Sequence, residues 1–474
     1  MNKNQHFMDE VVVALDIGTT KICALAGRMN DLGQLEVVGI GKVQSTGVLR
    51  GVVANIDRTV KAIQLAVEKV ERSTQSEIKD VYIGIAGQHI KSFQHHGVLP
   101  RDNSEVEISR EDLEEMRRTM HKMGLPPGDK ILHVIPQEYT VDNEAGINDP
   151  IGMSGIRLEA NFHIITGQQT AFNNMKRCVD RAGLRVKDMT LEPIASAQSV
   201  LTDEEVTAGV ALVDMGGGTT DLTVFHEGLI RHTAVIPFGG NVITKDIKEG
   251  CTVMQDQAEK LKIKFGSALE QEISDNRIIT IPGLKGRDAK EISEKNLALI
   301  IQARVEEILD YVYWEIQRSG YEQKLIGGIV LTGGGSLLKN IDKLTAFHTG
   351  MEARIGRPIE NLAHGYPKEL ESPIYSTGIG LLLKAVNSRT ISSISELVRS
   401  EIKFKYDDDT APLSAIKEQN EAVSEIAGSE SESMQADKSK DQSPGKPKMF
   451  DGFLTKVKEF FEATDDRNID DLNS

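Results

Sequence analysis

Short apolar runs that end in glycine-rich turns are the dominant pattern along this chain. One run, 11–15, leads into Asp16-Ile17-Gly18-Thr19-Thr20-Lys21 and a second apolar stretch. Another, 210–213, leads into Asp214-Met215-Gly216-Gly217-Gly218-Thr219-Thr220-Asp221 and again an apolar stretch. A third, 329–331, ends in Thr332-Gly333-Gly334-Gly335-Ser336 ahead of a segment of helical character at 337–344. The first two patterns predict β-hairpins with nearly bare turns, and the third predicts a strand, a turn and a helix.

Other segments carry the periodicity of helices or of buried strands. Residues 56–70 place their apolar side chains on one helical stripe, and Ser109 has the position of an N-cap with Asp112 three residues later. Further helices are expected at 171–182, 258–263, 297–316 and 377–383. Strands are expected at 81–87, 131–135, 139–141 and 162–165.

The glycine turns have the chemistry of phosphate-binding sites. Three consecutive glycines allow positive φ and close approach of backbone N–H groups to an anion, and Thr219 and Thr220 add hydroxyl donors. Asp214, at the end of its strand, is suited to hold a water of a hydrated Mg²⁺. An ordinary glycine-rich β-turn without a ligand is the alternative for one such turn. Two equivalent hairpins about two hundred residues apart favour duplicated domains that clamp phosphates between them.

The order of the three turns resembles the actin-like ATPase superfamily, which includes actin, the seventy-kilodalton heat-shock chaperones and hexokinases. The resemblance implies an α/β fold of two duplicated ribonuclease H-like lobes with two subdomains each, and ATP with Mg²⁺ between the lobes. It makes the first two turns phosphate motifs and the third an adenosine motif, and it assigns the hydrated metal to Asp16 and Asp214. Glu192, which precedes Pro193, resembles the residue that positions the attacking water. The nucleotide-binding residues so implied are Asp16, Gly18, Thr19, Thr20, Lys21, Asp214, Gly216, Gly217, Gly218, Thr219, Thr220, Asp221, Gly333, Gly334, Gly335 and Ser336.

A helical pair, Glu259 and Lys262, lies one turn apart on one face of the segment at 258–263. Such a pair is able to reach a ribose hydroxyl and an adenine edge, and the family uses a Glu and a Lys there. From spacing alone, an ordinary surface ion pair is equally compatible.

The insertion at 89–166 narrows the resemblance to the bacterial cell-division protein family FtsA, because Gln88-His89-Ile90 follows the strand at 81–87 and Ile135-Pro136-Gln137-Glu138-Tyr139 comes later. In that family an α+β subdomain, 1C, is inserted in the first lobe. The implied division is 11–88 and 167–206 for subdomain 1A, 89–166 for 1C, 207–242 and 318–400 for 2A, and 243–317 for 2B. His89, His95 and His96 within or next to 1C are expected to be solvated loop residues rather than a metal site, since no acidic partners lie near them in sequence.

The C-terminal region changes in character. Residues 407–445 hold ten acidic residues, three basic residues, seven serines and no aromatic residue, which predicts a disordered linker. Residues 446–463 predict an interfacial amphipathic helix, with lysines at the borders of its apolar face. A helix that docks on a protein is the alternative, whereas the FtsA resemblance implies membrane targeting. The membrane-binding residues are then Phe450, Phe453, Leu454, Val457, Phe460, Phe461, Lys456 and Lys458.

Composition agrees with a multidomain cytoplasmic protein. The chain has 474 residues and a net charge of −16, which disfavours a nucleic-acid partner. Cys23, Cys178 and Cys251 show no metal spacing. The polar start of the chain and the short run at 11–15 predict neither a signal peptide nor a membrane span.

The resemblance implies an ATP-binding scaffold with at most slow ATPase activity. It would form filaments, bind FtsZ and other division proteins, and attach the FtsZ ring to the cytoplasmic side of the inner membrane at the division site. A pilus-assembly actin-like ATPase and a small-molecule kinase of the same superfamily are the alternatives. A heat-shock-type chaperone is disfavoured, because no β-rich substrate domain follows the ATPase part.

Overall fold

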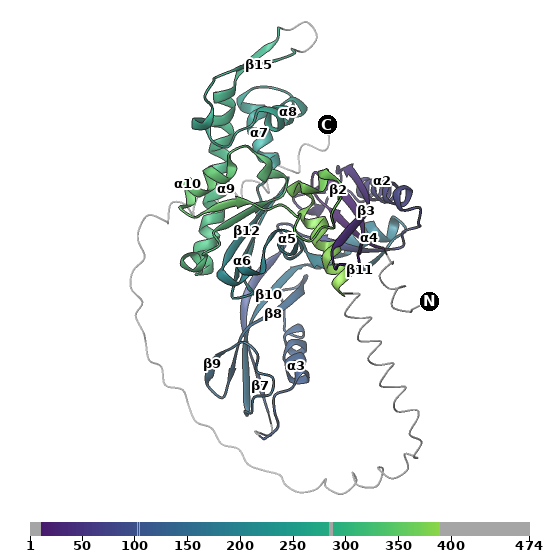
Figure 1. Ribbon diagram of the computed structural model, residues 1–474, viewed down its shortest axis with the longest axis vertical. Coiled ribbons are helices and arrows are strands. Elements are labelled where there is room, and N and C mark those ends of the chain that lie inside the picture. The colour runs from purple at the N-terminus through teal and green to yellow at the C-terminus, as the bar shows by residue number, and fades with distance from the viewer. Residues whose placement is uncertain (1–10, 102, 104, 284–287, 389–474) are drawn as a thin grey trace. The chain divides into compact units, whose positions relative to one another are not determined.

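The computed structural model describes residues 11–101, 103, 105–283 and 288–388. The chain divides into two units, Met1–Ile402 and Lys403–Ser474, and every described residue belongs to the first. The predicted linker at 407–445 and amphipathic helix at 446–463 therefore lie outside the described residues. The described part is built around two five-stranded sheets and one four-stranded sheet, with helices packed on them (Figure 1).

The first five-stranded sheet contains the predicted N-terminal hairpin. Its order is β11-β6-β1-β2-β3, with β1, β2 and β3 antiparallel and β6 and β11 parallel to β1. Both faces are buried: Val13 and Leu15 pack toward helices α2 and α4, whereas Val12 and Ala14 pack toward the helix at 376–388. The elements are β1 (Val12–Ile17), β2 (Lys21–Met29), β3 (Leu35–Gln44), α2 (Ile56–Thr74), β6 (Asp80–Ile85), α4 (Gln169–Arg181) and β11 (Arg185–Leu191).

The second five-stranded sheet repeats this arrangement. Its order, β14-β13-β12-β17-β18, again joins three antiparallel strands to two parallel ones. Val213 and Met215 face the core built by the long helix α9, and Val210 and Leu212 pack toward α5. The elements are α5 (Glu192–Val200), β12 (Val210–Met215), β13 (Thr220–His226), β14 (Leu229–Ile236), α9 (Glu294–Ser319), β17 (Ile329–Thr332), α10 (Ile341–Thr349) and β18 (Ala353–Ile355). Two sheets with one topology confirm the predicted duplication.

The four-stranded sheet is inserted between β6 and α4. Its order is β7-β10-β8-β9, entirely antiparallel, and Met116 and Met120 of α3 cover it. The predicted helix start is confirmed, because Ser109 and Asp112 form a capping box. The elements are β7 (Lys91–Pro100), α3 (Arg110–His121), β8 (Asp129–Val141), β9 (Glu144–Ile147) and β10 (Arg157–Gln168).

The strands predicted at 131–135 and 139–141 are confirmed, but they are parts of one strand, β8, that bulges against β10. The predictions for the three histidines were wrong. His95 and His96 lie in strand β7 rather than in a loop, and His89 is buried against Phe172. Among the described residues, no group of His, Cys, Asp and Glu is arranged to hold a metal ion directly.

Of the helices between β14 and β17, α9 packs on the second sheet, whereas α7 and α8 lie beyond it next to the β15 hairpin (Figure 1). The predicted helices at 258–263 and 297–316 are confirmed as α8 and α9. The segment at 337–344 is not one helix: η3 ends at Leu337, Asn340 has a left-handed φ of 61°, and α10 starts only at Ile341. The remaining elements are β4 (Val48–Leu49), β5 (Val52–Val53), α6 (Asp203–Ala208), α7 (Gly240–Gly250), α8 (Gln255–Phe265), η1 (Glu270–Glu272), β15 (Ile278–Ile281), β16 (Lys290–Ser293), η2 (Glu322–Lys324), η3 (Gly334–Leu337), η4 (Lys368–Glu371) and η5 (Pro373–Tyr375). In the part of the chain that the structure describes, no helix combines the length and apolarity needed to cross a membrane.

Candidate functional site

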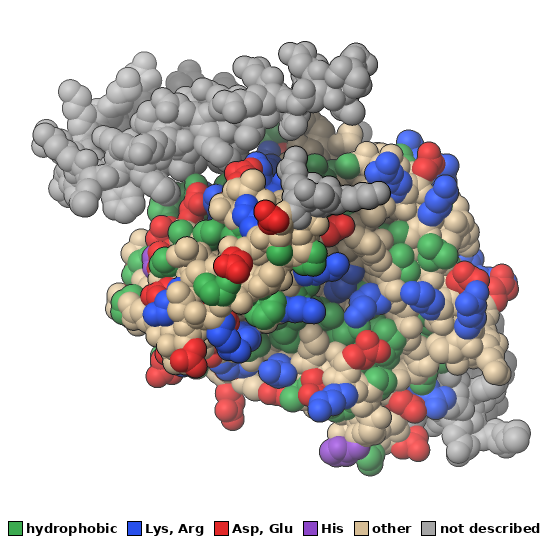
Figure 2. Space-filling model, turned by 90° about the horizontal axis from the view of Figure 1, so that it is seen from above, with side chains coloured by type: hydrophobic (Ala, Val, Ile, Leu, Met, Phe, Trp, Pro, Cys, Tyr) green, Lys and Arg blue, Asp and Glu red, His purple; other side chains and the backbone are tan. Residues whose placement is uncertain are grey.

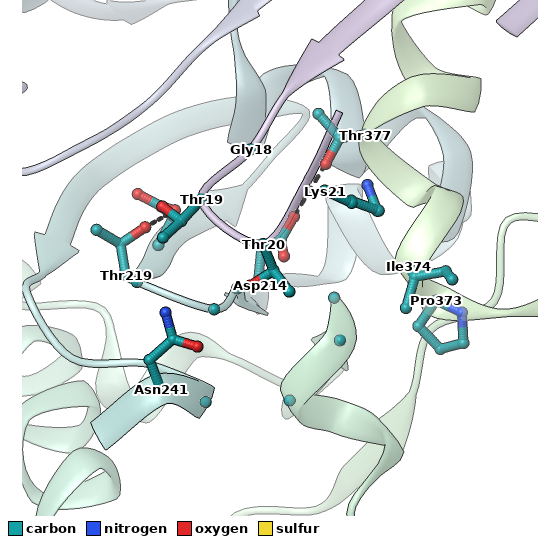
Figure 3. Close-up of a pocket in the computed structure, with 18 of the residues that line it drawn as sticks. Gly18, Thr19, Thr20, Lys21, Asp214, Thr219, Asn241, Pro373, Ile374 and Thr377 are labelled. Carbon is teal, nitrogen blue, oxygen red and sulfur yellow. Dashed lines mark hydrogen bonds between the residues drawn. The ribbon is translucent and has the colours of Figure 1, made fainter. Parts of the chain in front are cut away.

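One cavity of about 390 Å³ joins residues from all three glycine turns. Pockets of this size accommodate small molecules and cofactors. Most of the predicted nucleotide-binding residues, and Glu192, line it (Figure 3). The predicted residues among its walls are Asp16, Gly18, Thr19, Thr20, Lys21, Glu192, Asp214, Gly216, Gly217, Gly218, Thr219, Asp221, Glu259, Lys262, Gly333, Gly334 and Gly335.

The first two turns face each other across this cavity at very short range. A Cβ placed on Gly217 would lie 1.9 Å from Thr20 Oγ1, and one on Gly218 would lie 2.8 Å from Thr19 Oγ1. None of Gly216, Gly217 and Gly218 has a positive φ, so the prediction that these glycines serve a positive φ was wrong. Close approach of their N–H groups to an anion stays a prediction. At Gly217 and Gly218 the absence of a side chain instead permits the two turns to approach each other.

Two predicted hydroxyl donors point elsewhere. Thr220 Oγ1 donates to the backbone oxygen of Phe238 at 2.8 Å, and Ser336 Oγ donates to that of Gly333 at 2.8 Å. Both residues are buried and neither lines the cavity. Their hydroxyls hold the turns in shape. Their assignment to the nucleotide site stays a prediction, which the hydroxyl directions do not support.

Four carboxyl groups gather at the phosphate-turn end of the cavity: Asp16, Glu192, Asp214 and Asp221. The carboxylate of Asp214 is held by two hydrogen bonds. Its Oδ2 accepts from Ser196 Oγ at 2.7 Å and from Thr377 Oγ1 at 3.4 Å. Asp221 accepts from Thr219 through Oδ2, whereas its buried Oδ1 has no partner among the described residues. An unpaired buried carboxylate oxygen beside other acids favours a bound cation or a proton at this position.

The pKa values of these acids follow from burial and mutual repulsion. Burial and the neighbouring Asp214 raise the pKa of Asp221 to about 8. Burial also raises the pKa of Asp214. The pKa of Glu192 lies well above its ordinary value because of burial and the charges of Asp16, Asp221 and Asp214. The cluster therefore carries its full negative charge only when a positive group compensates it.

Lys21 provides part of that compensation. Its ammonium group forms an ion pair with Asp16, and both side chains are largely buried. Burial disfavours the charge on Lys21, but the adjacent Asp16 carboxylate outweighs it and raises the lysine pKa. Lys21 is thus positively charged at neutral pH and is engaged with Asp16 at the cavity wall.

The cavity wall also holds the predicted Glu–Lys pair. Lys262 Nζ lies 2.8 Å from Glu259 Oε2, and it donates to the Gly240 oxygen at 2.9 Å and to Thr244 Oγ1 at 2.7 Å. Both residues line the cavity. The pair therefore forms part of the cavity wall, and its contacts with Gly240 and Thr244 also join α8 to α7. The third glycine turn reaches the acid cluster: Gly333 has a φ of 79°, and a Cβ there would lie 2.3 Å from Asp214 Oδ1.

Several residues that line the cavity were not predicted from the sequence as site residues. Asn241 begins α7 together with Gly240, and their N–H groups donate to the oxygens of Gly217 and Gly216 at 2.8 and 2.9 Å. The run Gly239-Gly240-Asn241, which follows the apolar strand β14, could have predicted that a helix starts here. Pro373, Ile374 and Thr377 belong to a part of the chain that carries no glycine turn. The unpredicted residues are Ile17, Gly51, Ala86, Gly240, Asn241, Ile243, Ile263, Leu337, Leu338, Pro373, Ile374 and Thr377.

Comparison with protein families gives two matches. A family model described as "Cell division protein FtsA" matches residues 211–380. A second, described as "SHS2 domain inserted in FTSA", matches residues 87–166, the stretch that contains the four-stranded sheet.

Individual proteins of the FtsA family are similar in sequence to this chain over most of its length. Cell division protein FtsA of Pseudomonas aeruginosa is 40% identical over 405 residues, covering 85% of this chain and 95% of the relative. The FtsA proteins of Neisseria meningitidis and Escherichia coli K12 are 41% and 36% identical, covering 78% and 79% of this chain and 89% and 90% of the relatives.

Solved structures share the fold at low sequence identity. The PilM–PilN type IV pilus biogenesis complex aligns with a TM-score of 0.59 at 15% identity, covering 79% of this chain and 98% of that chain. MreB5 of Spiroplasma citri bound to ADP aligns with a TM-score of 0.50 at 15% identity, covering 82% and 99%. Together with the repeated sheet topology, these alignments confirm the predicted actin-like fold with an inserted α+β subdomain.

Proposed function

Because the chain belongs to the FtsA family of cell division proteins, we propose that it is an ATP-binding scaffold that attaches the FtsZ ring to the cytoplasmic face of the inner membrane. The observation that carries the nucleotide part is the approach of the two phosphate turns to each other across one cavity.

In this proposal the triphosphate of ATP lies between the turns at Gly18 and at Gly216–Gly218. Backbone N–H groups and the hydroxyls of Thr19, Thr20 and Thr219 donate to it, since backbone N–H groups of such turns form anion sites. The face drawn in Figure 2 supports an anionic ligand, because Lys and Arg side chains surround a hollow there although the whole chain is acidic. Glu259, Lys262 and the Gly333–Ser336 turn would lie beside the nucleoside.

Asp16 and Asp214 would hold the water shell of Mg²⁺, which when bound neutralises charge on the phosphate oxygens. The donor set fits this ion: Mg²⁺ prefers oxygen ligands and keeps several waters, so two carboxylates suffice.

Glu192 is the proposed residue that orients an attacking water. A Cβ on Gly84, in β6, would lie only 2.6 Å from the Glu192 Cγ. The absence of a side chain at Gly84 therefore leaves room for the Glu192 side chain. Burial and the neighbouring acids raise its pKa, so the ionised Glu192 is a stronger base than an ordinary carboxylate, which suits it to accept a proton from that water. We expect hydrolysis to be slow at most. ATP would act chiefly by stabilising one arrangement of the lobes, through its higher affinity for that arrangement.

The remaining parts of the proposal rest on family membership and on the sequence of the C-terminal region. The helix at 446–463 would insert Phe450, Phe453 and Phe460 into the lipid boundary. One such helix would bind weakly, and a filament with many copies would bind the membrane firmly.

FtsZ would bind through 2B, residues 243–317, and the scaffold would then recruit other division proteins. The subdomain boundaries at 88, 166, 206, 242 and 317 stay predictions. We do not favour a pilus-assembly role, because the likeness to PilM at 15% identity concerns the fold alone.

Calorimetric titration of ATP tests the nucleotide site. We expect wild-type protein to bind ATP in the presence of Mg²⁺ and to lose most of that affinity in EDTA. Asp214→Asn should weaken binding about 10- to 100-fold, as expected for a charged group removed from the site. The matched control Asp31→Asn changes an exposed aspartate outside the cavity and should leave binding unchanged. Wild-type protein without measurable affinity for Mg-ATP would contradict the proposal.

A further inference from the structure

The turn between β4 and β5 is a two-residue hairpin turn formed by Arg50 and Gly51. Leu49 pairs with Val52 on either side of it, and φ is 48° at Arg50 and 76° at Gly51. Positive φ at both central residues defines a turn type that strongly prefers Asn, Asp or Gly at the first position. An arginine in that place departs from the local preference, and such departures concentrate at functional sites.

This turn lies directly against both phosphate turns. A Cβ on Gly218 would lie 2.9 Å from the Arg50 Cα, and the Gly51 N–H donates to Thr19 Oγ1 at 3.1 Å. On its other side, the Arg50 oxygen would lie 2.9 Å from a Cβ on Gly87. The hairpin turn is therefore held between the second phosphate turn and the end of β6, at the phosphate end of the cavity.

The basic side chains in and beside the cavity differ in whether they have an acidic partner. The cations that line the cavity, Lys21 and Lys262, are paired with Asp16 and with Glu259. Arg50 is half-buried and has neither an ion-pair nor a hydrogen-bond partner within the described residues. Gly51 lines the cavity and the Arg50 side chain does not, so contact with a bound phosphate would require a change of the Arg50 rotamer.

We propose that Arg50 binds the terminal phosphate of the nucleotide and makes the site distinguish a triphosphate from a diphosphate. A guanidinium group matches a phosphate with two parallel N–H donors, which gives it a geometric advantage over an ammonium group. Because the Arg50 backbone rests on Gly218, engagement of the phosphate would also fix the β4–β5 turn between the lobes. This inference rests on the proposed nucleotide site and adds to it the group that senses the terminal phosphate.

Nucleotide affinities of three Arg50 variants test the inference. The probes are Mg-AMPPNP and Mg-ADP, titrated separately into the full-length protein. Arg50→Ala and Arg50→Gly should lose affinity for Mg-AMPPNP by about 10- to 100-fold, the effect of removing a charge-assisted hydrogen bond, and change less than about twofold for Mg-ADP. Arg50→Lys should keep an intermediate preference for the triphosphate.

Two controls separate the guanidinium from the backbone. Glycine suits the left-handed conformation at position 50, so Arg50→Gly should unfold at a midpoint no lower than wild type while losing triphosphate affinity. Leu49→Ala removes an exposed side chain from the same hairpin and should leave both affinities unchanged.

The outcomes are distinguishable. Variants that keep the wild-type ratio of AMPPNP to ADP affinity overturn the role of Arg50 and leave the proposed function intact. Variants that lose both affinities equally also overturn it, because the arginine would then support the site without sensing the terminal phosphate. Wild-type protein that binds neither probe refutes the proposed function, and the inference falls with it.

Discussion

Replacement of Gly217 by alanine is the sharpest perturbation of the contact between the two phosphate turns. The added Cβ would lie 1.9 Å from Thr20 Oγ1, a separation that real Cβ atoms do not show, and 3.2 Å from Thr20 Cβ. The Thr20 side chain must therefore rotate or one turn must move, and the short approach to Thr20 Cβ limits the relief that rotation alone can give. Inserting a methyl group into a packed position typically costs about 1–3 kcal/mol, so we expect the free energy of unfolding to fall by about this amount.

The matched control is Gly334→Ala, in the third glycine turn. A Cβ there would meet Ile374 Cγ2 at 3.7 Å, which is ordinary van der Waals contact, and Gly334 lines the same cavity. Its free energy of unfolding should change by no more than about 0.5 kcal/mol. Equilibrium urea unfolding of the two variants and of wild-type protein measures this difference.

A compensating change identifies the cause. Thr20→Ala removes the oxygen that the new Cβ would strike, so the double variant Gly217→Ala with Thr20→Ala should regain most of the lost stability. Nucleotide affinity is not a suitable readout here, because Thr20 is itself a proposed phosphate donor. A double variant as unstable as Gly217→Ala alone would refute the explanation by close approach.

Two further predictions concern the charged groups of the site. The raised pKa of Asp221, about 8, means that the folded protein binds a proton there which the unfolded chain releases near pH 4; its stability should therefore decline as pH rises from about 4 to 8. Asp221→Asn should reduce this decline, measured by urea unfolding at pH 5 and pH 8 without Mg²⁺, and an unchanged pH dependence would contradict it. Lys21→Met leaves Asp16 without its ion-pair partner and should cost about 3 kcal/mol of stability. Adding Asp16→Asn should restore part of that loss, and a purely additive double variant would show that the pair is not coupled.

The sequence was a good guide to elements whose pattern is local. The hairpins around Gly18 and Gly217 and the capping box at Ser109 could be predicted because each depends on neighbouring residues. The reason for the glycines could not, since the contact between Gly217 and Thr20 joins residues about two hundred positions apart in the chain.

Site residues were missed or misassigned for the same kind of reason. Thr220 was expected to face a ligand, but the packing of β13 directs its hydroxyl to Phe238, which no local pattern reveals. Pro373 and Ile374 reach the cavity only because the chain returns to it after β18. Arg50 was visible in the sequence, yet only its left-handed backbone and its contact with Gly218 distinguish it from other arginines.

Co-sedimentation with anionic liposomes in the presence of Mg-ATP tests the central claim most directly. The comparison is between the intact chain and a chain ending at Pro444, which lacks the segment at 446–463. We predict that the intact chain pellets with the liposomes, that the shortened chain stays in the supernatant, and that omission of Mg-ATP reduces pelleting. An intact chain that stays soluble with Mg-ATP would contradict a membrane-attached scaffold and would favour a protein partner for the C-terminal helix.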